Sequence, residues 1–260
     1  MWYNCHYYCP YPEVVLSIMQ ELSFYGNVPD DILSQEICER LLERLLYFRV
    51  QPSVVVDLCC RHGLSTKLLK QHFSSATVIG VENSYQPLRS ALKKRSWFKK
   101  FHVVNAPVRQ LPLAEEAVDF ILIHQLIASL EDMASILQEC FRVLKPEGCL
   151  LFSTLGPDSF KEVSLVNNVP LVDMHDVGDL LVRCGFSNPV MDRDDIVLRY
   201  QDARQLGDKL SAQNIALQLP PSTNQLTFEV IYGHAWRGRK KSPAGVQAVP
   251  ISQIKKLPRT

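Results

Sequence analysis

An alternation of short apolar runs and helix-like segments, beginning at residue 54, constrains the fold of this chain more than any other feature. Val54-Val55-Val56-Asp57 is a continuous β-branched run, as expected for a strand buried on both faces. Further strands are expected over residues 78–82, 101–104, 118–124 and 149–153, and helices over 64–72, 85–94 and 133–143. Such alternation predicts an α/β fold with a doubly wound, mostly parallel sheet and right-handed crossovers.

The pattern changes on both sides of this core. Helices are expected over residues 14–22 and from Pro29 to a point before Pro52. After the core, helices are expected over 158–166, 174–184 and 203–217, and strands over 195–200 and 226–232. The two late strands suit an antiparallel pair on the sheet edge. We therefore divide the chain into N-terminal helices (1–48), a core (49–156), cap helices and late strands of the same domain (157–236), and a basic, loosely ordered tail (237–260).

Composition argues against several classes of protein. The chain has 28 Lys and Arg against 27 Asp and Glu, a net charge of +1, which argues against a dedicated nucleic-acid binder. No apolar run approaches the ~20 residues of a membrane helix, and nothing reads as a signal peptide. The eight cysteines lack zinc-type spacing, with Cys5, His6 and Cys9 the nearest approach to a metal site. We expect a cytoplasmic protein with reduced thiols and no metal, which binds neither nucleic acid nor membrane.

Candidate site residues gather after the predicted strands. Ligands of open α/β sheets bind beyond the carboxyl ends of the strands, beside the first strand. This rule selects Asp57 to Gly63, Glu82, the loop from Asn105 to Arg109, and the pair His124 and Gln125. Glu82 is the strongest candidate, because an acid that ends the second strand can accept both hydroxyls of a ribose. The plainer alternative is an exposed acid after a strand.

Three further residues have both a functional and a structural interpretation. Asp57 is expected to accept hydrogen bonds from backbone N–H groups of the turn that follows, and so to hold the loop in shape. Gly63 is expected to let the backbone approach a ligand or a helix closely. His124 is a candidate general base by position, although a lone histidine at a strand end is more often a hydrogen-bonded structural residue.

Two ordered sets of motifs resemble known enzymes. The first set resembles class I S-adenosylmethionine (SAM)-dependent methyltransferases and comprises Val-Val-Val-Asp57, Gly-Val-Glu82, Leu-Pro112, Val-Asp119-Phe, Arg-Val-Leu-Lys-Pro-Glu-Gly148 and Leu-Phe-Ser-Thr154. The second set lies in the segments 153–157, 172–179, 185–191 and 227–236. Together they resemble the malonyl-acyl carrier protein (ACP) O-methyltransferases that start pimelate assembly in bacterial biotin synthesis. The resemblance runs from about residue 35 to residue 236.

This resemblance implies a seven-stranded, Rossmann-like sheet with a helical cap, SAM as cofactor, and methyl transfer to the free carboxylate of malonyl-ACP. Its cofactor-binding residues would be Asp57, Cys59, Gly63, Glu82, Asn105 and His124. An ionised carboxylate is already a nucleophile, so no catalytic base is required. The malonyl carboxylate would pair with a cation, for which Arg183 and Arg199 are candidates, although a solvated surface charge is an equal alternative for each. ACP is the expected partner, with the basic cluster 237–241 and the tail as candidate docking elements.

The cofactor loop departs from the family's acid-x-Gly-x-Gly-x-Gly pattern. Cys59 and Arg61 occupy the first two glycine positions, Pro107 stands where an acid near the adenine is usual, and Arg109 stands where Glu is common. The Arg61 guanidinium is expected either to point outward or to meet the carboxylate of the methionine moiety. Three interpretations remain: an active enzyme with a reshaped SAM pocket, a degenerate, non-catalytic paralogue that binds carrier protein, or a methyltransferase for another small carboxylic acid.

Overall fold

The fold is described from a computed structural model, which covers residues 32–47, 50–93, 100–126, 129–162, 164–165, 171–201, 217–218 and 223–238. Some of the predicted features fall outside these ranges. They are the helix over 14–22, the thiols Cys5 and Cys9 with His6, nearly all of the helix over 203–217, and the tail beyond residue 238.

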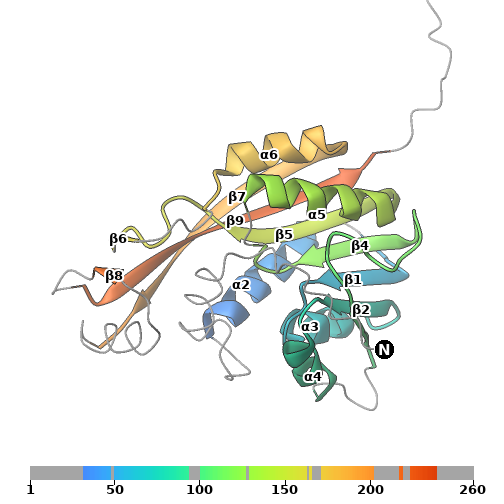
Figure 1. Ribbon diagram of the computed structural model, residues 1–260, viewed down its shortest axis with the longest axis horizontal. Helices are drawn as coiled ribbons and strands as arrows, with labels where there is room; N and C mark the ends of the chain where they lie inside the picture. The colour runs from blue at the N-terminus through green and yellow to red at the C-terminus, as the bar shows by residue number, and fades with distance from the viewer. Residues whose placement is uncertain are drawn as a thin grey trace, which may run out of the picture.

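Seven strands form one sheet in the order β3-β2-β1-β4-β5-β9-β7 (Figure 1). The parallel strands are β1 (Val54–Leu58), β2 (Thr77–Glu82), β3 (His102–Asn105), β4 (Val118–Ile123) and β5 (Leu144–Leu155). Strand β9 (Gln225–Arg237) runs antiparallel to β5, and β7 (Phe186–Arg199) runs antiparallel to β9 at the edge. A two-stranded sheet pairs β6 (Ser164–Leu165) with β8 (Leu217–Gln218). The predicted doubly wound sheet with an antiparallel edge pair is confirmed.

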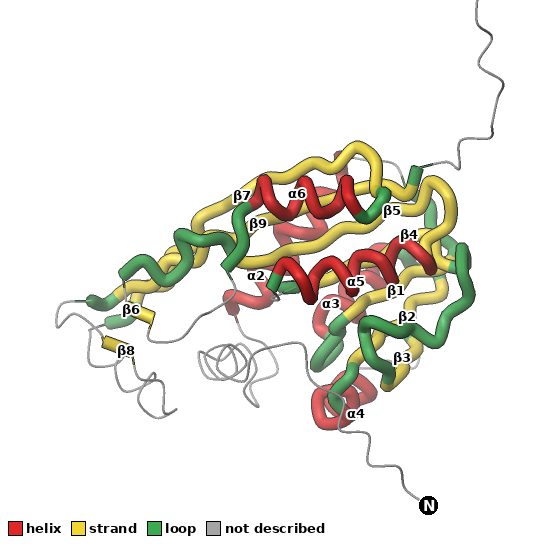
Figure 2. Tube along the Cα trace, turned by 45° about the horizontal axis from the view of Figure 1, so that its top comes forward, coloured by secondary structure: helices red, strands yellow, loops and turns green. Residues whose placement is uncertain are grey.

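Helices cover both faces of the seven-stranded sheet (Figures 1 and 2). They are α2 (Ile32–Glu43), the short 3₁₀ helix η1 (Arg44–Tyr47), α3 (Leu64–His72), α4 (Tyr85–Lys93), α5 (Leu130–Val143) and α6 (Met174–Arg183). On one face, Ile37 of α2 and Leu69 of α3 lie in the same buried core cluster. On the other face, Ile136 of α5 and Leu181 of α6 lie in the second core cluster. Helix α2 therefore packs into the same core as the sheet. Among the helices of the described residues, none has the length and apolar character of a membrane span.

The helix predicted over 158–166 is wrong. Residues 157–162 form turns, and 164–165 form β6. The carboxylate of Glu229, which is buried, accepts a hydrogen bond from the Asp158 backbone N–H at 2.7 Å. The rings of Phe160 and Phe228 pack edge-to-face with centroids 5.0 Å apart. These contacts with β9 fix the segment in a non-helical path, which overrides its helical spacing.

Three further features concern β5 and the elements that follow it. The motif residues Lys145 to Gly148 lie within β5 as an irregularity, with Glu147 in the left-handed region at φ 66°. The predicted strands over 195–200 and 226–232 are only parts of β7 and β9, which continue past the end of β5 as a long ribbon (Figure 1). Gly185 follows α6 with φ 95°, the left-handed conformation that glycine favours after a helix end.

Candidate functional site

The candidate site lies at the carboxyl ends of the parallel strands. Strands β2 and β3 extend the sheet to one side of β1, and β4 and β5 extend it to the other, so the strand order reverses between β1 and β4. Ligands of open α/β sheets bind at such a switch point. Asp57 lies near the end of β1, Glu82 ends β2, Asn105 ends β3 and His124 follows β4. The structure therefore brings these four predicted residues to one edge.

The loop after β1 keeps a glycine-like backbone without most of the glycines. Cys59, Arg61 and Gly63 all have positive φ, at 59°, 48° and 77°. The N–H of Cys60 donates to the carbonyl of Val81 at 3.0 Å, which ties the loop to β2. A non-glycine residue in this region costs on the order of 1–2 kcal/mol. Cys59 and Arg61 thus adopt the left-handed conformation that glycine favours, at a cost in backbone strain.

Glu82 is the acceptor on which this loop closes. Its carboxylate accepts from the backbone N–H of Arg61 at 3.0 Å and from that of Ser84 at 2.8 Å. Asn105 donates its side-chain amide to the carbonyls of Glu82 and Asn83, both at 2.8 Å. Each carboxylate oxygen can accept more than one hydrogen bond, so Glu82 keeps acceptor capacity for a ligand hydroxyl. Asn105 acts on the turn after β2 and so positions Glu82.

Asp57 is fully buried beneath the loop. Its Oδ2 accepts hydrogen bonds from the hydroxyls of Ser65, at 2.7 Å, and Thr66. Backbone N–H groups of the turn were the expected donors, but the hydrogen bonds come from hydroxyls of α3. Burial raises the pKa of Asp57 to about 7, against the opposing effect of the two hydroxyls. Its Oδ1 has no hydrogen-bond partner in the described part of the chain.

His124 is buried at the end of β4. Burial, and to a smaller extent the charge of Arg61, lower the pKa of His124 to about 3. Its Nε2 has no partner among the residues the structure describes. The imidazole is neutral at neutral pH and far too weakly basic to suit general-base chemistry there. The geometry favours a neutral hydrogen-bonding group.

Arg61 reaches across the switch point from β1 to β4. Its Nη1 donates to Oε1 of Gln125 at 2.7 Å, and its Nη2 donates to the Gln125 carbonyl at 3.1 Å. Ser34 of α2 also donates to Gln125 Oε1, at 3.2 Å. Sequence reasoning missed Ser34, because 91 residues separate it from Gln125 and no local pattern links them. Within the described ranges, no cluster of three or more His, Cys, Asp or Glu could hold a metal ion.

Comparison with known proteins agrees with this geometry. A family model described as a methyltransferase domain matches residues 56–152, which span β1 to β5. A malonyl-[acyl-carrier protein] O-methyltransferase of Legionella pneumophila is 32% identical, over 86% of this chain and 91% of the relative. One of Coxiella burnetii is 34% identical, over 88% of this chain and 90% of the relative.

This chain belongs to the malonyl-ACP O-methyltransferase family. It is a SAM-dependent methyltransferase by domain and by fold. A solved methyltransferase of Bacillus halodurans superposes with a TM-score of 0.61 at 13% identity, covering 77% of this chain and 98% of that one. A phosphoethanolamine N-methyltransferase of Haemonchus contortus, solved with S-adenosylhomocysteine (SAH), gives 0.57 at 13% identity, over 88% of this chain and 62% of that one. At these identities the two structures show the fold alone.

The two arginines predicted to meet substrate lie apart in the methyltransferase. Arg183 ends α6 and is exposed, and β7 begins beside it, paired with the end of β9 near the amino end of the parallel strands. Arg199 ends β7, also exposed, on the ribbon that extends past the carboxyl end of β5. The structure thus separates Arg183 from the predicted cofactor residues and leaves Arg199 on their side of the sheet. Arg109 forms an ion pair with Asp132 of α5.

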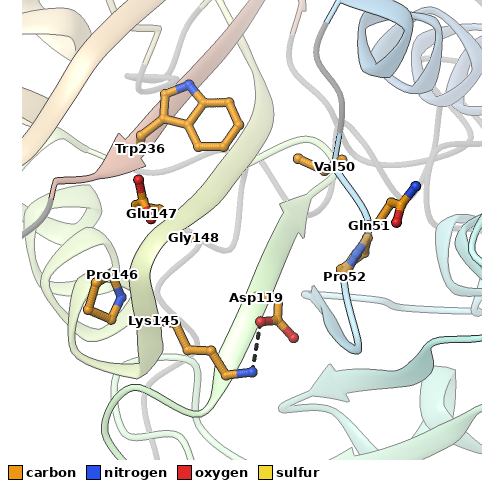
Figure 3. Close-up of a pocket in the computed structure, with 9 residues that line it drawn as sticks. All are labelled: Val50, Gln51, Pro52, Asp119, Lys145, Pro146, Glu147, Gly148 and Trp236. Carbon is orange, nitrogen blue, oxygen red and sulfur yellow. Dashed lines mark hydrogen bonds and ion pairs between the residues drawn. The ribbon is translucent and has the colours of Figure 1, made fainter.

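A pocket of about 240 Å³ lies at the opposite edge, at the amino ends of β1 and β4 (Figure 3). Its polar centre is structural. The carboxylate of Asp119 accepts from the backbone N–H groups of Ser53 and Val54, at 3.0 and 2.8 Å, and pairs with Lys145 at 2.7 Å. These bonds tie β5 to the start of β1. The pocket is therefore separate from the methyltransferase site.

Gly63 packs too closely against α4 to tolerate a side chain. A Cβ at this position would lie 2.8 Å from the Cβ of Ala91 in α4. We expect Gly63→Ala to lower the free energy of unfolding by about 2–5 kcal/mol, the sum of overpacking and a left-handed alanine. Urea unfolding measures it, with Gly178→Ala as the control, because the nearest atom there is 3.6 Å away. Because Gly178 lies inside α6, where alanine is favoured, the control should lose no stability. An equally small effect in Gly63→Ala would mean that the loop and α4 move apart at little cost.

Proposed function

We propose that this chain transfers the methyl group of SAM to the free carboxylate of malonyl-ACP, as the reaction that begins pimeloyl assembly for biotin. The observation that carries the proposal is the loop after β1, which is hydrogen-bonded to the Glu82 carboxylate at the switch point. The chain also matches, over most of their length, relatives that are named malonyl-ACP O-methyltransferases. The site residues fit SAM. Buried polar atoms without partners in the described chain gather there, on Asp57, His124 and Gln125.

The residues that would hold SAM come from three strand ends. Glu82 would accept the ribose hydroxyls, because its carboxylate ends β2 and retains acceptor capacity. The loop at Cys59 to Gly63 would present its backbone to the cofactor, since its conformation is the one that glycines favour. Asp57 and Asn105 would act by holding the loop and Glu82 in place.

Methyl transfer to an ionised carboxylate needs no general acid or general base from the protein. When bound, SAM supplies a methyl group on a sulfonium leaving group. The malonyl carboxylate is ionised at neutral pH and needs no deprotonation, which agrees with the weak basicity of His124. What the chain provides is alignment of the two reactants and a partly dehydrated site, which together lower the barrier by several kcal/mol.

The substrate would contact basic side chains that lie near the carboxyl ends of the parallel strands. Of the two candidate arginines, Arg199 is the one we retain for the malonyl carboxylate. Arg237 does not suit carrier docking, because it is buried and bonds the carbonyls of Arg142 and Leu144 and, at 2.8 Å, the carboxylate of Glu116. A docking role for the tail would rest on the residues after it.

Turnover with SAM and purified malonyl-ACP tests the proposal. We expect the intact carrier to gain the mass of one methyl group, and acetyl-ACP, which has no free carboxylate, to remain unchanged. Complementation of a biotin auxotroph that lacks this activity is the matching test in cells. Binding of ACP without methylation would favour the non-catalytic paralogue, and methylation of free malonate or another small acid in place of malonyl-ACP would favour the third interpretation.

A further inference from the structure

We infer that Arg61 is a cofactor-binding residue that replaces the family's second loop glycine with a carboxylate clamp, acting on the methionine carboxylate of SAM. This inference rests on the proposed function and adds a specificity-determining contact to it. It also decides between the two expected orientations of the guanidinium, since the side chain turns inward across the switch point.

The position of the guanidinium follows from the sheet order. Glu82 at the end of β2 would take the ribose, and a methionine part directed toward the switch point would extend from β2 over β1 toward β4. The two hydrogen bonds from Arg61 to Gln125 bridge this path, at 2.7 and 3.1 Å. The amino-acid end of the ligand therefore arrives where the guanidinium lies.

The chemistry of the site suits a carboxylate. Arginine presents parallel N–H donors that match a carboxylate in a bidentate pair. Gln125 adds a second donor, because its Nε2 is buried and has no partner among the residues described. A ligand carboxylate would replace the neutral amide oxygen as the acceptor of Nη1, and the Gln125 amide would turn to direct its Nε2 toward that carboxylate.

The site is held in place before any ligand arrives. The N–H of Gln125 donates to Ser153 Oγ of β5 at 2.9 Å, and Ser34 donates to its side-chain oxygen. The backbone of Arg61 is fixed by Glu82. Because the backbones of both residues are fixed, little conformational freedom is lost on binding, which partly offsets the strain of a left-handed arginine.

A cycle of two ligands and two proteins tests the inference. Calorimetry would measure the binding of SAH and of decarboxylated SAH to the wild type and to Arg61→Ala. We expect loss of the ligand carboxylate to weaken binding to the wild type by roughly tenfold or more, and binding to Arg61→Ala by less than about threefold. In Arg61→Lys, removing the ligand carboxylate should weaken binding by an intermediate factor, because lysine keeps the positive charge but lacks the paired N–H donors of the guanidinium. Arg89→Ala, which removes an exposed arginine of α4, should match the wild type.

A second variant keeps the test independent of how Arg61→Ala folds. Gln125→Glu supplies a carboxylate that competes for Arg61, so it should weaken SAH by about tenfold and leave the decarboxylated ligand unaffected. Equal losses in all proteins, or tighter SAH binding by Arg61→Ala, would show an obstructive arginine and overturn the inference alone. No SAH binding by any of them at millimolar ligand would overturn the proposed function as well.

Discussion

Glu82→Ala is expected to weaken SAH binding by at least tenfold, about 1.4 kcal/mol or more. Two losses add up in this variant. The ribose hydroxyls would lose their acceptor, and the backbone N–H groups of Arg61 and Ser84 lose the carboxylate that closes the loop. Calorimetric titration with SAH measures the effect.

Two controls separate these contributions. Glu82→Gln keeps one oxygen acceptor, so it should keep only one of the two backbone hydrogen bonds and should weaken SAH binding less than Glu82→Ala does. Glu115→Ala removes an exposed acid that precedes β4, at the opposite edge, and should bind SAH like the wild type. Unchanged affinity in Glu82→Ala would place the ribose elsewhere in the site.

Asp57 and His124 are expected to give the folded state opposite responses to pH. The pKa of Asp57 is raised by burial to about 7 from an ordinary value of 3.8, so the folded state keeps a proton that the unfolded chain releases. Stability from this group is present below about pH 4 and is lost as the pH rises toward 7. The loss amounts to roughly 4 kcal/mol, at about 1.4 kcal/mol for each pKa unit.

His124 responds in the opposite direction. Its pKa is lowered by burial to about 3 from 6.5, so the unfolded chain takes up a proton that the folded state refuses. Stability from His124 is present above about pH 6.5 and is lost as the pH falls toward 3. Between about pH 5 and 6.5 the two slopes oppose each other, and the wild type should show little dependence from this pair.

Single variants should expose each slope. In Asp57→Asn, the free energy of unfolding should rise with pH between about 5 and 6.5, because the titration of His124 is then no longer opposed by that of Asp57. In His124→Gln it should fall over the same interval, by up to about 1.4 kcal/mol per pH unit. Urea unfolding at several pH values measures both. Parallel curves for the two variants would contradict the assigned pKa directions.

The strands and helices of the core could be predicted because each is indicated by the residue types within the element itself. A β-branched run such as Val54 to Val56 has few alternatives to a buried strand. In the helices that follow, apolar residues recur at helical spacing. Reliance on local spacing is also why the helix over 158–166 was predicted wrongly. Its spacing is helical, but contacts of Asp158 and Phe160 with β9, which lies far along the chain, decide its path.

The candidate site divides in the same way. The sequence by itself determined the family, the doubly wound sheet and the strand ends at Asp57, Glu82 and His124, because these depend on residue order and on a topological rule. It also showed that Arg61 stands in a glycine position. Only the tertiary structure decided that the loop keeps its shape, that Arg61 meets Gln125 across the switch point, and that Arg237 is buried. These depend on contacts between segments distant in the chain, which no local pattern specifies.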